Sequence, residues 1–242
     1  MRRFYIPQSE FNIDNIVLNG VEHNHLKNVL RLKENERVVV VCGDGNDYEC
    51  EIVEINKTST YLKLIETTKN LYDSHADVTV YQALTKSDNM ALIIQKLTEL
   101  GVKRFVPFES RYVTAKDKSG KTDKLQQISN QSIKQCKRST PMCVESTLSF
   151  KQMVKELKKF DKVVFANECE HTQNLSDIKF SKNEKVALII GSEGGFSEEE
   201  IKEIIVNNGI SVSLGRRILR AETASIALTS VVMFLMSEWC YE

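Results

Sequence analysis

The sequence predicts an α/β protein that carries a smaller β-rich part at its N-terminal end. Up to about residue 70, short runs of β-branched residues alternate with clusters of turn-forming residues, a pattern typical of hairpins. From Asp77 onward, strand-like and helix-like segments alternate, as they do in a largely parallel sheet covered by helices. Residues 71–76 between the two patterns form a candidate linker. We therefore expect two domains, at residues 1–70 and 76–242.

The β-rich part contains two successive predicted hairpins. Strands are expected at residues 36–42, 48–55 and 61–65, with turn clusters at residues 43–47 and 56–59. Such a run predicts a small barrel or sheet. Residues 21–32 predict one short helix, in which Leu26, Val29 and Leu30 share a face.

The rest of the chain predicts strands and helices in near alternation. Strands are expected at residues 78–84, 104–108, 162–167, 185–191 and 210–214, and helices at residues 88–100, 122–137, 150–159, 197–208 and 221–239. The strand at 185–191 is almost entirely apolar, which is typical of burial on both faces of a sheet. Ser197 and Glu200 form the pattern of a capping box at a helix start, and Gly101 is placed to end helix 88–100.

The net charge of the whole chain differs from that of one of its segments. The 33 basic and 33 acidic residues cancel, which argues against a protein that coats nucleic acid through its overall field. Between Lys103 and Arg138, however, ten Lys and Arg residues face three acidic ones. This excess either contacts phosphates or forms an ordinary solvated surface.

The composition also bears on redox chemistry, metals and membranes. The six cysteines are scattered and form no CxxC pair, so we expect reduced thiols, no zinc site and a cytoplasmic protein. Cys42 and Cys50 fall on opposite sides of a predicted hairpin, which does not by itself imply a disulfide. No apolar run reaches the roughly 18 residues that a membrane span needs, and the N-terminus has no secretory signal pattern.

Two segments carry the candidate chemistry, and each lies between a predicted strand and a predicted helix. The first is GSEGGFS at residues 191–197, and the second is LGRRILRAETA at residues 214–224. Ligands of open α/β sheets bind at the carboxyl ends of strands, where glycines allow close backbone approach and helix starts favour anionic groups. Neither segment has the GxGxxG or GK[ST] pattern of a nucleotide loop. The alternative interpretation is a pair of plain strand-to-helix turns.

The two segments, with several others in order, resemble one family. Besides GSEGGFSEEEI at 191–201 and LGRRILRAETA at 214–224, the chain contains HLKNVLR at 25–31, LTKSDNM at 84–90, QKLTELGV at 95–102, Ser110-Arg111 and QCKR at 135–138. Together they resemble the RsmE family of knotted SPOUT methyltransferases, almost from end to end. The chain departs from that family at Ser192 and Arg216, where proline is usual, and at Gln131 and Lys134, where glutamate is frequent. None of these departures removes the two glycine-bearing loops.

The resemblance implies a fold, a reaction and a set of partners. It implies an N-terminal PUA-like β-barrel and a C-terminal α/β domain whose chain passes through a trefoil knot, a feature that no periodicity predicts. It implies methylation of N3 of one specific uridine in 16S ribosomal RNA of the small subunit. S-adenosylmethionine would be the methyl donor and S-adenosylhomocysteine the product, with no metal. The family forms homodimers, and helices 221–239 and 88–100 are candidates for that interface.

The resemblance also implies roles for individual residues. The expected cofactor-binding residues are Leu84, Asn167, Glu168, Gly191, Ser192, Glu193, Gly194, Gly195, Leu214, Gly215, Ile218, Leu219 and Arg220. RNA contacts are expected from Arg2, Arg3, His25, Arg31, Arg111, Lys137 and Arg138. Arg220 is expected to stabilise the anion that forms when uridine N3 loses its proton. Glu222 is a candidate acceptor of that proton, with a water molecule or a partner-subunit group as alternatives.

Three other functions compete with this interpretation. One is a knotted methyltransferase with another RNA target, such as a ribose hydroxyl or a guanine. Another is a non-catalytic RNA-binding or assembly factor on the same fold, although the retained glycines at 191, 194, 195 and 215 argue against it. The third is an enzyme that uses the glycine loop for a nucleotide phosphate.

Overall fold

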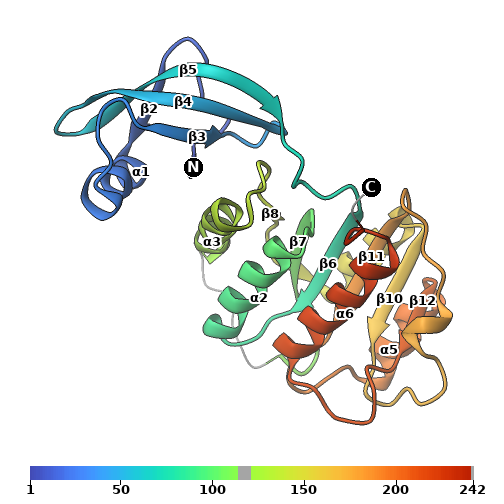
Figure 1. The fold of residues 1–242 in the computed structure, drawn as a ribbon. Coiled ribbons are helices and arrows are strands. Elements are labelled where there is room, and N and C mark those ends of the chain that lie inside the picture. Colours follow the sequence, from blue (N-terminus) through green and yellow to red (C-terminus); the bar gives the residue numbers. More distant parts are fainter. Residues whose placement is uncertain (114–120, 241–242) are drawn as a thin grey trace. The chain divides into compact units, whose positions relative to one another are not determined.

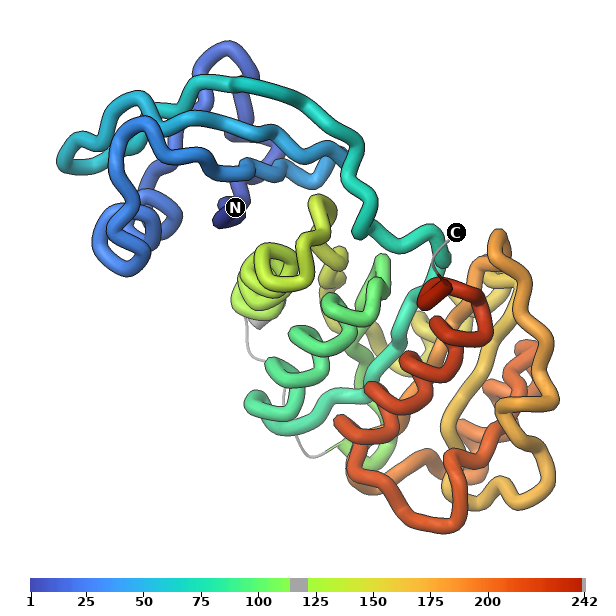
Figure 2. Tube along the Cα trace, in the orientation of Figure 1, coloured from blue at the N-terminus to red at the C-terminus, as the bar shows by residue number. Residues whose placement is uncertain are grey.

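The computed structural model describes residues 1–113 and 121–240. Contacts divide the chain into two compact units (Figures 1 and 2). The first unit is Met1–Asp73 together with Asn130–Pro141, and the second is Ser74–Ser129 together with Met142–Glu242. Of the basic stretch noted above, Lys116, Asp117 and Lys118 lie outside the described residues.

The first unit contains a five-stranded sheet in the order β1-β3-β4-β5-β2. Its strands are β1 (Arg2–Tyr5), β2 (Ile16–Asn19), β3 (Arg37–Val41), β4 (Asn46–Ile55) and β5 (Ser59–Lys69). β1 pairs with β3 in parallel and the other pairs are antiparallel. The sheet is curled (Figure 1). Its buried core includes Phe4, Leu18, Val40 and Ile52. The three expected strands are confirmed, whereas β1 and β2 were missed because each is short and pairs with a strand distant in sequence.

The expected helix at residues 21–32 consists of two parts. α1 (Gly20–Asn24) continues directly into a π-helical turn (His25–Leu30), and Arg31 ends it with a left-handed φ of 54°. Leu26 is fully buried and Leu30 packs partly against the core, but Val29 is 68% exposed. The expectation that Val29 shares their face is therefore wrong, since a π turn is wider than the 3.6-residue period on which it was based.

The second unit contains a seven-stranded, wholly parallel sheet. Its order is β12 (Gly209–Val212), β10 (Lys162–Ala166), β11 (Lys185–Ile190), β6 (Asp77–Ala83), β7 (Arg104–Glu109) and β8 (Cys143–Val144), with β9 (Leu148–Ser149) also paired to β7. Five α-helices follow strands along the chain: α2 (Ser87–Glu99), α3 (Lys121–Cys136), α4 (Phe150–Glu156), α5 (Glu198–Val206) and α6 (Ala221–Leu235). This arrangement confirms the predicted α/β architecture with a parallel sheet. The knot stays a prediction, because sheet order and pairing do not by themselves establish one.

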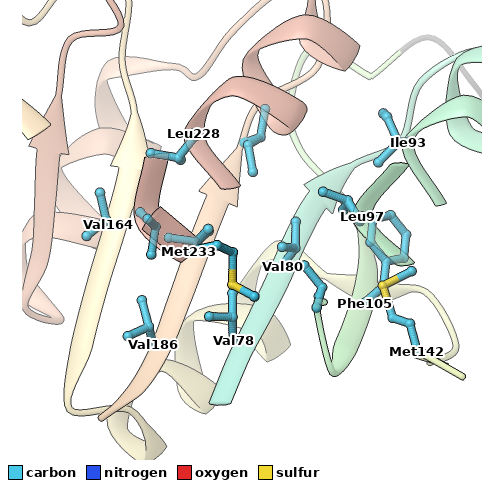
Figure 3. Close-up of a cluster of buried hydrophobic side chains, with 14 of the residues drawn as sticks. Val78, Val80, Ile93, Leu97, Phe105, Met142, Val164, Val186, Leu228 and Met233 are labelled. Atoms are coloured by element: carbon cyan, nitrogen blue, oxygen red, sulfur yellow. The ribbon is translucent and has the colours of Figure 1, made fainter. Parts of the chain in front are cut away.

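Alternate residues of the central strands build a core on each face of this sheet. Val78 and Val80 of β6 pack with Ile93 and Leu97 of α2 and with Met233 of α6 (Figure 3). On the other face, Tyr81 and Ala83 of β6 join side chains of α4 and α5. Both faces of β6 and β11 are therefore buried, as the apolar run at 185–191 predicted for β11.

Three local expectations about helix ends can be compared with the structure. Ser197 and Glu200 form the predicted capping box of α5. Gly101 follows α2 with a φ of 96°, which only glycine adopts readily. The last helix is shorter than the expected 221–239: α6 ends at Leu235, and Ser237, with a φ of 65°, turns the chain back so that its N–H binds the Phe234 carbonyl.

Residues 130–141 belong to the first unit although they follow β7 in the sequence. Ile133 is buried against Val39 and Val41, and Lys134 forms an ion pair with Glu22. The carboxylate of Asp73 accepts hydrogen bonds from the backbone N–H groups of Ser139 and Thr140, both 3.1 Å long. The candidate linker at residues 71–76 does not account for this return of residues 130–141 to the first unit. Among the described helices, none combines the length and apolar character that crossing a bilayer requires.

Candidate functional site

The candidate site residues of the second unit gather at the carboxyl ends of four neighbouring strands. These strands are β12, β10, β11 and β6, which lie side by side in the sheet. Leu84 follows β6, Asn167 and Glu168 follow β10, the glycine-rich loop follows β11, and Leu214 and Gly215 follow β12. Because the strands are parallel, these loops leave the same edge of the sheet, where ligands of open α/β sheets bind.

The glycine-rich loop after β11 is tightly folded. Gly195 donates its N–H to the Ser192 carbonyl at 3.0 Å and has a φ of 67°. A Cβ on Gly195 would lie 3.2 Å from Oε1 of Glu168, and one on Gly191 would lie 3.2 Å from the Gly195 carbonyl carbon. Side chains at these positions would therefore displace the loop or the Glu168 carboxylate. The glycines allow this close packing of the loop at the strand end.

A further loop, after β7, packs against the glycine-rich loop. A Cβ on Gly194 would lie 2.9 Å from Cβ of Tyr112, so this position needs glycine for the two loops to meet. Arg111 donates its backbone N–H to Glu200 at 2.9 Å, and its guanidinium binds Glu199 at 2.8 Å. Tyr112 remains 48% exposed beside the loop. Sequence analysis missed Tyr112, and its only signal was its position just after a strand.

Gln82 was also missed, and it lies under the glycine-rich loop. It is fully buried in β6 and donates from Nε2 to the carbonyls of Ala83 and Gly191, both at 3.1 Å. Its Oε1 atom is buried without a hydrogen-bond partner among the described residues. A polar side chain in an otherwise apolar central strand is a detectable signal, since such groups are normally paired.

The loop after β12 is open to its surroundings. Gly215 has a φ of 102°, and a Cβ there would meet no atom within 4 Å. The Gly215 N–H binds Oγ of Ser213 at 3.2 Å, and the Ser213 N–H binds the Gln173 carbonyl at 3.2 Å. Arg216 and Ile218 are exposed, and Leu219 is half-buried. The start of the loop is thus held by hydrogen bonds, whereas its tip is exposed.

Arg220 and Glu222 lie at the start of α6. Arg220 is the N-cap residue and its side chain is exposed. Glu222 lies in the first turn, where the helix dipole favours a negative charge. Its Oε2 atom is buried and has no hydrogen-bond partner within the described part of the chain. Such an acceptor is uncommon in a folded protein, which makes Glu222 a candidate site residue.

The buried thiols of the first unit are not candidates for nucleophilic chemistry. Burial raises the pKa of Cys42 to about 11 and that of Cys50 to about 12, so both stay protonated near neutral pH. No disulfide joins the described cysteines. Within residues 1–113 and 121–240, no group of three or more His, Cys, Asp or Glu side chains is arranged to hold a metal ion.

Comparisons with known proteins identify the family. A family model described as an RNA methyltransferase domain matches residues 73–233, and one described as an RNA methyltransferase PUA domain matches residues 18–65. Proteins named ribosomal RNA small subunit methyltransferase E from Bacillus subtilis and Rickettsia conorii are each 30% identical to this chain. Each alignment covers 97% of this chain and 96% of the relative. The chain belongs to the ribosomal RNA small subunit methyltransferase E family.

Solved structures agree with this membership and with the predicted fold class. A methyltransferase from Legionella pneumophila, solved with bound SAM, is 26% identical and matches with a TM-score of 0.87 over 96% of both chains. The ribosomal RNA small subunit methyltransferase E of Neisseria gonorrhoeae, bound to S-adenosyl methionine, is 25% identical. It also has a TM-score of 0.87 and covers 97% of this chain and 98% of its own. The resemblance seen in the sequence motifs is thereby confirmed.

The residues expected to contact RNA in this ribosomal RNA small subunit methyltransferase E family member are spread over both units. Arg2, Arg31 and Lys137 are exposed in the first unit, and His25 is half-buried there. Arg111 belongs to the second unit, where 60% of its side chain is exposed. The exposed side chains of Arg2, Arg31 and Lys137 can reach phosphates, whereas the exposed Arg111 guanidinium forms an ion pair with Glu199 at 2.8 Å.

Arg3 and Arg138 differ from that group because they are engaged within the first unit. Both terminal nitrogens of Arg3 bind the Asp47 carboxylate. The Arg138 side chain is 4% exposed and lies 3.6 Å from Asp73. These contacts indicate a role in holding the first unit together.

Proposed function

We propose that this protein transfers a methyl group from S-adenosylmethionine to N3 of a specific uridine in 16S ribosomal RNA. The observation that carries the proposal is the edge of the parallel sheet from which both glycine-bearing loops leave, with Arg220 and Glu222 at the start of the helix that follows the second loop. Oε2 of Glu222 is buried there without a hydrogen-bond partner among the described residues. Family membership supplies the small-subunit RNA as substrate, and the Neisseria gonorrhoeae relative supplies the cofactor. A protein that acts on the small ribosomal subunit works in the cytoplasm.

The residues at this edge fit the cofactor. The loop is closely packed at Gly191, Gly194 and Gly195, because a Cβ there would collide with neighbouring atoms. Gly215, in contrast, faces open space. Backbone amides and carbonyls of these loops can therefore approach an extended polar ligand closely. The cofactor, when bound, supplies a methyl group on a positively charged sulfur. The residues that would hold it are Leu84, Asn167, Glu168, Gly191, Ser192, Glu193, Gly194, Gly195, Leu214, Gly215, Ile218, Leu219 and Arg220.

Asn167 shows how the loop after β10 is prepared for this role. Its backbone N–H binds the Val212 carbonyl at 3.0 Å and its side-chain amide donates to Oγ of Ser211 at 3.1 Å. Its Oδ1 atom accepts the N–H of Cys169 at 3.1 Å. The loop is therefore held against β12 before any ligand binds, which lowers the entropy cost of binding.

Arg220 and Glu222 would carry the proton chemistry. Uridine N3 becomes a nucleophile when its proton leaves, and negative charge then spreads onto the uracil oxygens. The exposed Arg220 guanidinium can donate to those oxygens. The Glu222 carboxylate has a buried oxygen ready to accept a proton or a hydrogen bond. Orientation of the base beside the methyl group would supply much of the remaining rate enhancement.

The same proposal includes the organisation of the molecule. Residues 1–70 would form an RNA-binding PUA-like barrel domain and residues 76–242 a knotted catalytic domain. Arg2, Arg31, His25, Lys137 and Arg111 would contact the RNA. Exposed apolar side chains support a homodimer, with Phe234 57% exposed and Val231 42% exposed on α6, and Leu92 40% exposed on α2. Such side chains are typical of surfaces that a second subunit covers.

Methyl transfer to small ribosomal subunits tests the proposal directly. The subunits come from a strain that lacks this gene, the donor is tritiated S-adenosylmethionine, and the product nucleosides are identified by mass spectrometry. We expect 3-methyluridine. Another methylated nucleoside would show that the enzyme acts on a different RNA target. RNA binding without cofactor binding would favour a non-catalytic RNA-binding factor.

A further inference from the structure

A groove with a volume of about 540 Å³ lies within the first unit, between the helical segment 20–30 and the end of α3. The segment contributes residues at helical spacing, and α3 contributes two residues one turn apart. The lining residues are Val21, Asn24, His25, Asn28, Val29, Gln131 and Lys134. A volume of this size is typical of sites that bind small molecules or parts of larger ones.

The walls of the groove combine apolar surface with amide groups. Val21 is 72% exposed and Val29 is 68% exposed, so both present apolar surface rather than joining the core. The amide of Asn28 donates to that of Asn24 at 3.3 Å, which links the two along one wall. Amides both donate and accept hydrogen bonds, and the edges of nucleobases do the same around apolar faces.

The groove carries little free charge. Lys134 is the one acidic or ammonium side chain in its lining, and it pairs with Glu22 at 2.8 Å, with the two side chains 10% and 14% exposed. A charged peptide or a free phosphate would find no unpaired counter-charge there. A neutral, flat and hydrogen-bonding ligand matches the groove better.

His25 and the backbone around it give the groove a defined shape. The His25 ring packs edge-on to the buried Phe4 at a centroid distance of 6.1 Å, which restricts its orientation. His25–Leu30 forms a π-helical turn, and the left-handed Arg31 follows it. Both features are rare, and they occur often at functional sites, where the surrounding structure maintains them.

We propose that this groove binds a single unpaired nucleobase of the ribosomal RNA substrate, as a recognition site in the first unit separate from the methyl-transfer loops of the second. The inference rests on the proposed function, since that function makes RNA the substrate. The base packs against the valine side chains, the Asn24, Asn28 and Gln131 amides bind its edge, and the His25 ring offers a stacking face. RNA-binding proteins recognise unpaired bases by this combination of stacking and edge contacts.

Fluorescence anisotropy with three RNA probes tests the inference. The probes are a single strand of about ten nucleotides, which matches common single-strand site sizes, the same strand paired to its complement, and the same ribose-phosphate backbone without bases. The test variant is the double substitution Asn24→Leu and Asn28→Leu, which removes both amides at nearly constant size. The control is Asn15→Leu, an exposed asparagine of the same unit outside the groove.

We expect the double variant to bind the single strand about tenfold more weakly than the wild type, as for the loss of two hydrogen bonds. The control should bind as the wild type does. The backbone without bases should bind the wild type and the double variant equally, because the groove contacts only the base. The melting temperature of each variant is measured in parallel. If the double variant fails to fold, Asn28→Ala replaces it, with an expected weakening of about two- to fivefold.

Three results would overturn the inference: equal single-strand affinity of wild type and variant, an equal loss of affinity for the backbone without bases, or no binding of the single strand by the wild type. Failure of the proposed function has a different signature, because it removes methyl transfer by the wild type while leaving this binding difference intact. With an active enzyme, the double variant should raise the KM for small subunits and leave kcat and S-adenosylmethionine affinity unchanged.

Discussion

The two ends of the parallel sheet use polar groups in opposite ways. At the start of β7, Arg104 donates to Glu145 at 3.0 Å and to Glu156 at 2.9 Å, and Tyr81 donates to Glu156 at 2.7 Å. At the other end, Gln82 near the end of β6 and Glu222 in the first turn of α6 each keep a buried oxygen that no described residue binds. Around Arg104 the chain's own side chains pair with one another, whereas at the carboxyl ends two buried oxygens have no hydrogen-bond partner among the described residues. Substitutions at the two ends should therefore separate stability from activity.

The largest expected effect is that of Arg220→Ala on catalysis. Removing a donor to a developing anion should lower kcat for methyl transfer about 100- to 1000-fold, while the melting temperature stays unchanged because the side chain is exposed. The matched control is Lys202→Ala, an exposed cation on α5. A kcat within about twofold of wild type would remove Arg220 from the mechanism, while partial rescue by Arg220→Lys would support a cationic role.

A smaller effect is expected from Gly195→Ala on cofactor binding. The new Cβ would lie 3.2 Å from Glu168 in a left-handed backbone conformation, so the loop must shift. Strain of this kind costs roughly 1–3 kcal/mol, so we expect the Kd for S-adenosylmethionine, measured by calorimetry, to rise about tenfold. Gly20→Ala is the control, since Gly20 also has a positive φ but faces open space in the first unit. Equal affinity of Gly195→Ala and Gly20→Ala for S-adenosylmethionine would contradict the close packing of the loop around Gly195.

At the opposite end, Glu156→Gln should affect stability and spare activity. The substitution keeps the size of the side chain but removes the charge that Arg104 and Tyr81 bind. We expect the free energy of unfolding in denaturant to fall by about 1–3 kcal/mol, the usual range for hydrogen bonds to a charged group, with kcat unchanged. A loss of activity in a folded Glu156→Gln protein would break the proposed division between the two ends.

The smallest expected effect is the pH dependence of the stability difference between the wild type and Glu156→Gln. Burial alone would raise the pKa of Glu156, but hydrogen bonds from Tyr81, Arg104 and Lys159 outweigh it and lower the pKa from 4.5 to about 2. The unfolded chain therefore binds more protons between these values, so the stabilisation is complete above about pH 4.5 and is lost as the pH falls toward 2. Melting temperatures of wild type and Glu156→Gln should converge over this window. A constant difference would assign the stabilisation to packing instead.

Local signals in the sequence anticipated much of the second unit. The capping box of Ser197 and Glu200, the stop at Gly101 and the apolar strand at 185–191 all depend on neighbours within a few residues. The same holds for the glycine-bearing loops at 191–197 and 214–224, whose strand-to-helix positions are confirmed. Val29 shows the limit of this reasoning, because a π turn changed the period on which its predicted burial rested.

Contacts between distant residues decided the rest. The parallel pairing of β1 with β3 and the return of residues 130–141 to the first unit join segments that no local pattern connects. The placement of Tyr112 against Gly194 and of Gln82 beneath Gly191 has the same origin. So does the engagement of Arg3 by Asp47 and of Arg138 by Asp73.

The sequence by itself determined the α/β class, the family motifs and the loops at which a ligand would bind, because periodicity, capping and turn chemistry act over a few residues. Only the tertiary structure decided which polar groups find partners within the chain and which buried atoms have none among the described residues. The physical reason is that a hydrogen bond or an ion pair depends on distances in space, and those are set by how strands pair and helices pack.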